Sequence, residues 1–320
     1  MNLRFKTSLL EHAKAVGAWA QRNAARTLID AVDLSLTVRF DSREYRLFPQ
    51  FVGRRDGKKL VYFDVPDQFA IGFVGWLPYR PQAWDISLDK LVFKAAARDL
   101  DIAMPAHWRD PGEVNAPFLV KRARGAFGYG MHGPWPAAHA SELALQDGEY
   151  CEEFKWGRIA RAWYWGNRLA VLEVFDMPSV IGDGRASYES LLRQASTELP
   201  TDFADVARLQ GVQPGDVPPE GTRIVCDYRY VSPFNPTLYA NSNLLPRLAG
   251  TQLGQRFADA GERLWPRIPA LPGQVIGFVL DAIVDDQGQP WFLEVNSNPQ
   301  WHPDIYGPML DALCRPQGAP

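Results

Sequence analysis

Two acidic residues and an asparagine near the C-terminus could together bind a cation. The segment GQVIGFVLDAIVDDQGQPWFLEVNSNP contains two β-prone runs separated by DDQGQ, a stretch typical of a turn. If the turn is centred near Gln287 and Gly288, Asp281 on the first strand lies opposite Glu294 on the second. Opposed residues on antiparallel strands point to one face with Cβ atoms about 5 Å apart. Asn296 shares that face because side chains alternate along a strand.

Two interpretations fit this face of the hairpin. Unpaired carboxylates so close together repel each other, and hard oxygen ligands suit Mg²⁺, which usually completes its shell with water and nucleotide phosphate oxygens. The alternative is an exposed polar face of an edge hairpin, neutralised by Arg or Lys. The spacing alone leaves both open. The opposite face is predicted to join the core through Phe278, Leu280, Ala282, Leu293 and Val295.

A glycine-rich segment earlier in the chain could approach phosphates. In KRARGAFGYGM, Gly125, Gly128 and Gly130 permit a loop whose amides can come close to an anion. Lys121 precedes this loop and could place its ammonium on the same phosphates. The segment is not a Walker motif, because the lysine comes before the glycines. A plain glycine-rich turn is the alternative, and Lys90 is either a second phosphate ligand or a solvated surface lysine.

Periodic patterns predict the elements that position these residues. The N-terminal third is expected to hold a helix over 8–30, short strands between 33 and 77, and a helix over 87–100 with Ser87 as N-cap. The rest is expected to hold a strand and glycine loop over 116–131, strands over 149–175, a loop and helix over 178–192, a Pro/Gly-rich surface connection over 211–222, a strand RIVCDYRYV, a helix over 246–265 and the hairpin over 274–296.

Composition excludes several classes of partner. The net charge is −3 with no basic block, which gives nucleic-acid binding no electrostatic support. No apolar run approaches the roughly 20 residues that span a bilayer, and the N-terminus has no signal-peptide pattern. Three scattered cysteines have no metal-binding spacing. A cytoplasmic protein without a membrane or nucleic-acid partner is expected, and its oligomeric state is left open.

Several segments, in this order, resemble the ATP-grasp superfamily, and in particular the branch with cyanophycin synthetase, bifunctional glutathione synthetase and D-alanine–D-alanine ligase. SLDKLVFKAAARDLDIAMP is similar to the family's "DK…K" helix segment, and FLVKRARGAFGYG to its phosphate-binding lysine strand and glycine-rich lid. EYCEEFKWGRIARAWYWGNRLAVLEV resembles the region that holds adenine. PSVIGDGRASYESLL and VLDAIVDDQGQPWFLEVNSNPQWH resemble a "P…V-G-D-G" segment and the metal-binding D…E-(V/I)-N-x-x-P finish. The resemblance covers about residues 85 to 312.

The resemblance implies an α/β (α+β) fold in which two ATP-grasp subdomains hold ATP between two antiparallel sheets. An N-terminal domain over 1–84 would precede an ATP-grasp domain over 85–320, with a lid subdomain over about 118–175 and a C-terminal metal-binding subdomain over 176–320. Residues 1–80 lack the glycine-rich βαβ opening of many such ligases, and the role of residues 1–84 is not readable.

The resemblance also implies roles for individual residues. Carried over position by position, the nucleotide-binding residues are Lys90, Lys121, Gly125, Gly128, Gly130, Glu152 or Glu153, and Phe154. One or two Mg²⁺, for which Mn²⁺ could substitute, would be bound by Asp281, Glu294 and Asn296. Arg161 and Arg223 are candidates for the acyl-phosphate or acceptor site, and Asn241 and Asn243 resemble an asparagine segment near substrate and metal.

The expected activity is a carboxylate–amine ligase acting on small-molecule or peptide substrates. ATP would phosphorylate a carboxylate, and an amine would then displace phosphate, forming a C–N bond. Two alternatives are a kinase of the same fold that phosphorylates a small-molecule hydroxyl, and a non-catalytic ATP-binding module. The sequence does not name the acid, the amine or the pathway.

Overall fold

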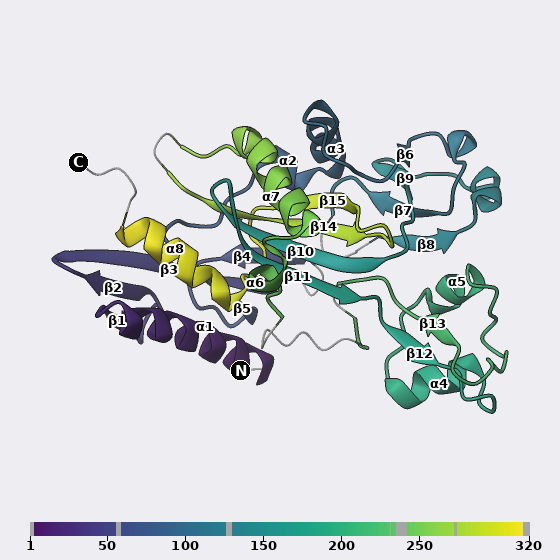
Figure 1. Ribbon diagram of the computed structural model, residues 1–320, viewed down its shortest axis with the longest axis horizontal. Helices are drawn as coiled ribbons and strands as arrows, with labels where there is room; N and C mark the ends of the chain where they lie inside the picture. Colours follow the sequence, from purple (N-terminus) through teal and green to yellow (C-terminus); the bar gives the residue numbers. More distant parts are fainter. Residues whose placement is uncertain are drawn as a thin grey trace.

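Four antiparallel sheets organise the part of the chain that the computed structural model describes, which is residues 3–55, 59–125, 130–230, 232–234, 242–271 and 274–315. Helices pack against these sheets (Figure 1), so the mixed α/β class predicted from the sequence is confirmed. None of the helices in these ranges is long and apolar enough to cross a membrane.

The N-terminal sheet follows a long helix, α1 (Leu3–Arg22). Its strands are β1 (Arg26–Ile29), β2 (Leu36–Phe40), β3 (Arg43–Arg55), β4 (Lys59–Phe63) and β5 (Ala70–Leu77). The prediction of a helix up to residue 30 is wrong. The chain leaves the helical region at Ala24, whose φ is 53°, a left-handed conformation that ends a helix and lets the chain reverse into β1.

Two short helices lead from this sheet towards the glycine-rich segment. They are α2 (Asp85–Leu88) and α3 (Lys90–Asp99). The predicted N-cap at Ser87 is wrong, because Ser87 lies inside α2. Asp89 caps α3 instead, since its side chain accepts a hydrogen bond from the amide of Leu91. This cap fixes the position of Lys90 at the first turn of α3.

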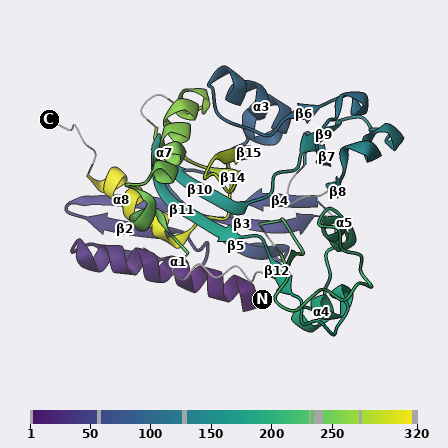
Figure 2. The same ribbon diagram turned by 45° about the vertical axis from the view of Figure 1, so that its right-hand side comes forward.

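A small sheet holds the strand that carries Lys121. Its order is β6 (His107–Trp108), β9 (Glu149–Glu153), β7 (Phe118–Arg122) and β8 (His132–Trp135), with two 3₁₀ turns, η1 (Pro111–Glu113) and η2 (Ala137–Glu142), beside it. A buried cluster of Phe118, Val120, Ala140 and Cys151 holds this sheet together. In Figure 2 the sheet lies at one end of the molecule, above α4 and α5.

The central sheet contains the C-terminal hairpin. Its order is β11 (Arg168–Asp176), β10 (Arg158–Trp165), β14 (Gly277–Val284) and β15 (Pro290–Asn296). The helix predicted over 246–265 is in fact two helices, α6 (Leu245–Leu248) and α7 (Gln252–Leu264), because the chain turns at Gly250 and a new helix starts with Thr251 as N-cap. After α7 come η3 (Trp265–Arg267), η4 (Pro303–Ile305) and α8 (Tyr306–Cys314).

One buried core joins the N-terminal sheet to the central sheet. The backbone amide of Trp301 donates to the carbonyl of Val74 at 3.0 Å, and the amide of Trp76 donates to the hydroxyl of Tyr306 at 2.8 Å. Helices α1 and α8, at opposite ends of the chain, lie side by side (Figure 1). The domain boundary at residue 84 stays a prediction, and the buried core extends across it.

The remaining lobe is built from β12 (Ser179–Ile181), β13 (Arg223–Val225), α4 (Tyr188–Ala195) and α5 (Phe203–Arg208). The strand predicted for RIVCDYRYV is wrong beyond Val225, because residues 226–230 leave the two-stranded ladder and run as irregular backbone. This irregular segment brings Tyr228, Arg229 and Tyr230 to the cleft described below.

The packing of α7 on the central sheet depends on Gly261. A Cβ atom at this position would lie 2.2 Å from Cε1 of Tyr164. That ring cannot easily move, because it stacks on Phe278 and its hydroxyl donates to the carbonyl of Phe257 at 2.7 Å. The clash should cost about 1–3 kcal/mol, whereas alanine gains at most about 1 kcal/mol in helix propensity. We therefore expect Gly261→Ala to lower the free energy of unfolding.

Gly307→Ala in α8 is the matched control, since a Cβ atom at that position would have open space within 4 Å. Urea denaturation of both variants checks the prediction. Equal stability of the two variants would contradict it.

His12 gives the stability a specific pH dependence. Burial, with a smaller contribution from His302, lowers the pKa of His12 to about 3. Between about pH 6.5 and 3 the unfolded chain therefore binds a proton that the folded chain does not, and stability falls as the pH falls through this range. His12 alone should remove about 2.5 kcal/mol between pH 7 and pH 4.5. In His12→Gln this fall should be smaller, whereas His132→Gln, at an exposed histidine of β8, should keep the wild-type profile of urea denaturation against pH.

Candidate functional site

The C-terminal hairpin places the predicted metal ligands next to one another. Asp281 pairs with Glu294 in the register of β14 and β15, as predicted. Nδ2 of Asn296 donates to Oδ2 of Asp281 at 3.0 Å, which confirms that both side chains lie on one face. The placement of Leu293 in the core is wrong. A β-bulge makes Leu293 the extra residue of β15, so that it faces the cleft while Phe292 takes the core position.

The neighbouring strand β10 supplies a cation to this face. Arg161 pairs with Asp281 across the ladder, and its Nε and Nη2 donate to Oδ1 and Oδ2 of that carboxylate at 2.5 and 2.9 Å. The guanidinium lies 3.6 Å from the ring centre of Tyr230, a cation–π contact. Burial raises the pKa of Asp281, and Arg161 offsets only part of that effect. The bidentate pair thus fixes the direction of both side chains.

Helix α3 supplies the cation for the second carboxylate. Nζ of Lys90 lies 3.0 Å from Oε2 of Glu294 and also donates to the carbonyl of Gly125 at 2.6 Å. Burial disfavours the ionised form of Glu294, but the charges of Lys90, Lys121 and Arg161 outweigh burial and lower the pKa of Glu294. Lys90 therefore connects α3, the C-terminal hairpin and the start of the glycine-rich segment.

Lys121 reaches the same region from β7. Its ammonium donates to Oε1 of Glu152, and Lys94 lies 2.6 Å from Oε2 of the same carboxylate. Burial opposes ionisation of Glu152, yet the two lysines hold its pKa at about 2. Glu152 is thus an ionised partner of two lysines. The neighbouring Glu153 instead contacts Lys155 and accepts from the amide of Ala106.

Apart from Lys94, these side chains line one cleft with a cavity volume of about 350 Å³. One half is charged, and its side chains contact one another; the other half is apolar, and its residues belong to one hydrophobic cluster or pack against it. The walls come from the small sheet, the central sheet, Met177 before β12 and the segment after β13. The apolar wall consists of Leu119, Met131, Phe154, Ile159, Met177, Ile283 and Leu293. The amide of Phe154 is occupied by the carbonyl of Pro117 at 2.7 Å, while the amide of Lys155 donates to no acceptor in the described part of the chain.

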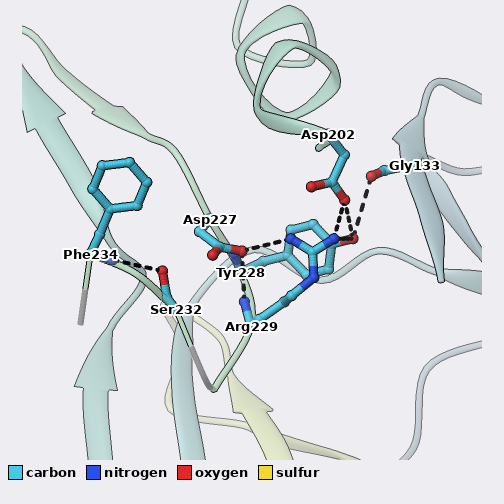
Figure 3. A network of polar contacts seen from close by, with 7 residues as sticks. All are labelled: Gly133, Asp202, Asp227, Tyr228, Arg229, Ser232 and Phe234. Carbon is cyan, nitrogen blue, oxygen red and sulfur yellow. Dashed lines mark hydrogen bonds and ion pairs between the residues drawn. The ribbon is translucent and has the colours of Figure 1, made fainter. Parts of the chain in front are cut away.

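The segment after β13 adds a wall that the sequence analysis missed. Figure 3 shows Arg229 held between Asp202 and Asp227, with Nη1 3.1 Å from Oδ1 of Asp227. The hydroxyl of Tyr228 donates to Oδ2 of Asp202 at 2.8 Å and to the carbonyl of Gly133 on β8 at 3.3 Å. The alternating polar and aromatic residues of DYRY could have been interpreted as more than a strand, because a guanidinium between aromatic rings is a common ligand wall.

Tyr62 was also missed, because nothing in the sequence connects β4 with the hairpin. It lines the cleft from the N-terminal sheet. Burial is the main cause that raises the pKa of Tyr62 to about 12; Arg161 opposes this rise and Glu294 adds to it. The N-terminal sheet therefore forms part of the site.

Not every predicted residue joins the cleft. Arg223 is half exposed on β13, where it contacts Ser179 and the carbonyl of Met177, and it is not among the lining residues. Gly130 lies just past the cleft with a φ of 71°. Gly128 and Asn241 lie outside the described residues. Asn243 donates to Asp304 at 2.9 Å and also lies outside the lining.

The hairpin residues fit a hard divalent cation. No group of three His, Cys, Asp or Glu side chains suited to a metal occurs among the residues with described positions, so the candidate set consists of two carboxylates and an amide. Because Nδ2 of Asn296 donates to Asp281, Oδ1 of Asn296 makes no hydrogen bond with that carboxylate and can serve as a metal ligand. Oε1 of Glu294 accepts from none of the described residues. Oδ1 of Asp281 accepts only from Arg161 among them and keeps a second lone pair, whereas Oδ2 already accepts from both Arg161 and Asn296. Two carboxylates and one amide oxygen are a donor set that Mg²⁺ accepts.

Comparisons with known proteins give matches at the level of three-dimensional structure only. No protein-family model matches the sequence, and no curated protein sequence matches it. The structural matches are ATP-grasp enzymes, the superfamily that the sequence motifs resemble. The chain spans less than two thirds of the length of each protein named below.

A bifunctional glutathione synthetase from Pasteurella multocida is similar over 90% of this chain and 40% of its own, with 13% identity and a TM-score of 0.41. The D-Ala:D-Ser ligase VanG from Enterococcus faecalis is similar over 68% of this chain and 54% of its own, with 15% identity and a TM-score of 0.39. A D-alanine–D-alanine ligase from Bacillus anthracis, complexed with ATP, covers 71% and 64%, with 14% identity and a TM-score of 0.36.

The Arg161–Asp281 pair makes a stability prediction. Arg161→Met leaves the Asp281 carboxylate without its cation. Removing one partner of a buried pair costs about 3–5 kcal/mol, and the pair's 14–15% side-chain exposure places the expected loss near the lower end of that range. The double variant Arg161→Met/Asp281→Asn should recover part of the loss in urea denaturation. Arg208→Met, which breaks an exposed pair, should cost at most about 1 kcal/mol. Equal losses in the single and double variants would contradict the assignment.

Proposed function

We propose that this chain is an ATP-grasp enzyme that binds Mg-ATP and joins a carboxylate to an amine through an acyl phosphate. The observation that carries the proposal is the division of one cleft into an apolar half and a charged half. A nucleoside triphosphate has the same division, with a flat apolar base at one end and a polyanion at the other.

The apolar half suits the purine. Side chains of Phe154, Met177 and Ile283 offer a dry wall for the ring, and the unused amide of Lys155 can donate to a ring nitrogen. Glu152, which pairs with two lysines, is better suited to the phosphate end, so Glu153 is the better candidate for the ribose.

The charged half suits the phosphates. Lys90 and Lys121 project into it from α3 and β7, and the backbone at Gly125 lies against Lys90. Gly128 and Gly130 belong to the same proposed lid. Asp281, Glu294 and Asn296 would hold one or two Mg²⁺ ions. The bound metal would neutralise charge on the phosphate oxygens during transfer.

Arg161 is the best candidate for the reacting end of the cleft. Nε and Nη2 are engaged by Asp281, whereas Nη1 donates to none of the residues that the structure describes. This leaves one edge of a rigidly held guanidinium for an oxyanion, such as a substrate carboxylate or the acyl phosphate made from it. The amine would then attack the acyl carbon and release phosphate, with water excluded to prevent hydrolysis.

The activity is tested by ADP release in the presence of paired candidate acids and amines. The ligase proposal expects turnover that requires both substrates. A phosphorylated product formed without an amine would instead identify a kinase. Mg-ATP binding without turnover across a broad substrate screen would identify a non-catalytic module.

Glu294→Gln tests the proposed metal site. The substitution removes a carboxylate charge but little volume, so the variant should fold and lose at least about a hundredfold in kcat, in line with the loss of a charge-stabilising group. Glu262→Gln, at an exposed position on α7, is the matched control and should keep full activity. Wild-type turnover by Glu294→Gln at limiting Mg²⁺ would remove this residue from the metal site.

A further inference from the structure

Lys94 occupies a position in which lysine is rarely found. Its side chain on α3 has 0% exposure, although lysine is almost never fully buried unless it is paired. Its Nζ lies 2.6 Å from Oε2 of Glu152, whose Oε1 accepts a hydrogen bond from Lys121. Two ammonium groups therefore share one carboxylate, and the group Lys94–Glu152–Lys121, here called the buried triad, has a formal charge of +1.

The buried triad has one side towards the cleft and one side away from it. Lys121 and Glu152 line the cleft, whereas Lys94 is not among the lining residues. Lys94 therefore does not touch a ligand in the cleft and can act on it only through the charge and position of its two partners.

The other ion pairs at the charged end are balanced. Lys90 pairs with Glu294, and Arg161 pairs with Asp281, one cation to one carboxylate in each case. Of the Lys90–Glu294 pair, the Arg161–Asp281 pair and the buried triad, only the buried triad therefore has a net positive charge. Without Lys94, the carboxylate of Glu152 would neutralise Lys121, and all three groups would be neutral towards a polyphosphate.

We propose that Lys94 is a positioning residue that offsets the charge of Glu152, so that Glu152 can hold Lys121 in the cleft without cancelling its attraction for the phosphates of a nucleotide. The inference rests on the proposed function. This role explains why a lysine is buried here. The Glu152 carboxylate orients the mobile ammonium of Lys121, and the Lys94 ammonium offsets the charge of that carboxylate, so that Lys121 still attracts an anion. Charges in such a dry site act strongly because little water screens them.

The ionised state of Glu152 agrees with this division of roles. Burial opposes its ionisation, but Lys121 and Lys94 together lower the pKa of Glu152. Burial also lowers the pKa of Lys94, and the adjacent Glu152 carboxylate opposes that effect. The hydroxyl of Tyr150 also lies 3.4 Å from Oε2 of Glu152, so that this oxygen is held from two sides while Oε1 is left to Lys121.

The test compares binding of Mg-ATP and of adenosine by calorimetry in four proteins: the wild type, Lys94→Met, Glu152→Gln and Lys94→Met/Glu152→Gln. Lys94→Met should weaken Mg-ATP binding at least about tenfold, as expected for one unit charge lost within several Å at an effective dielectric constant of about 20, and leave adenosine binding unchanged. The double variant should recover Mg-ATP affinity to within about threefold of the wild type, because Lys121 then faces no carboxylate. Lys14→Met, at an exposed lysine on α1, should bind as the wild type does.

The outcomes separate this inference from the proposed function. If the wild type does not bind Mg-ATP, the proposed function fails and the inference fails with it. If the wild type binds and Lys94→Met weakens ATP and adenosine equally, or the double variant remains as weak as Lys94→Met, only the inference is overturned. If Lys94→Met does not fold, Glu152→Gln decides. Its amide oxygen can still accept from Lys121 while the negative charge is gone, so it should bind Mg-ATP more tightly than the wild type; equal or weaker binding would overturn the role of Lys94.

Discussion

Pairing of buried charges is the constraint on which the cleft depends. Each carboxylate at its charged end pairs with a cation from an element other than its own. Asp281 pairs with Arg161 of β10, and Glu294 pairs with Lys90 of α3. Glu152 pairs with Lys94 of α3 and Lys121 of β7. An ion taken out of water without a partner costs several kcal/mol. Helix α3, the small sheet and the central sheet must therefore dock in one arrangement, and that arrangement creates the site.

The same constraint gives the cleft its two halves. Charged groups gather where α3 and the hairpin meet, since they satisfy one another there, and the apolar residues of β7, β10 and β14 are left to form the other wall. The N-terminal sheet shares the core of the central sheet and adds Tyr62 to the charged half. A region whose role could not be inferred from its own residues thus contributes to the candidate site.

Prediction from the sequence succeeded where a feature depends on nearby residues and failed where distant packing decides. The facing of Asp281 and Glu294 follows from a short turn and strand alternation, both local. The bulge that turns Leu293 into the cleft was not predictable, because a bulge is an irregularity in strand pairing that alternation does not encode. Helix α1 was predicted too long, because the left-handed residue that ends it is an alanine and carries no glycine signal.

The sequence by itself determined the residue types at the hairpin and the order of the ATP-grasp-like segments, because these are properties of neighbouring residues. Only the tertiary structure decided what each charge contacts. It paired Glu152 with two lysines, left Arg223 outside the cleft, and brought Arg229 and Tyr230 into it. The physical reason is that Coulomb energy and desolvation depend on distances between elements, which spacing along the chain does not contain. The grouping of Asp281, Glu294 and Asn296 was therefore predictable, whereas the particular lysine and arginine that pair with these carboxylates were not.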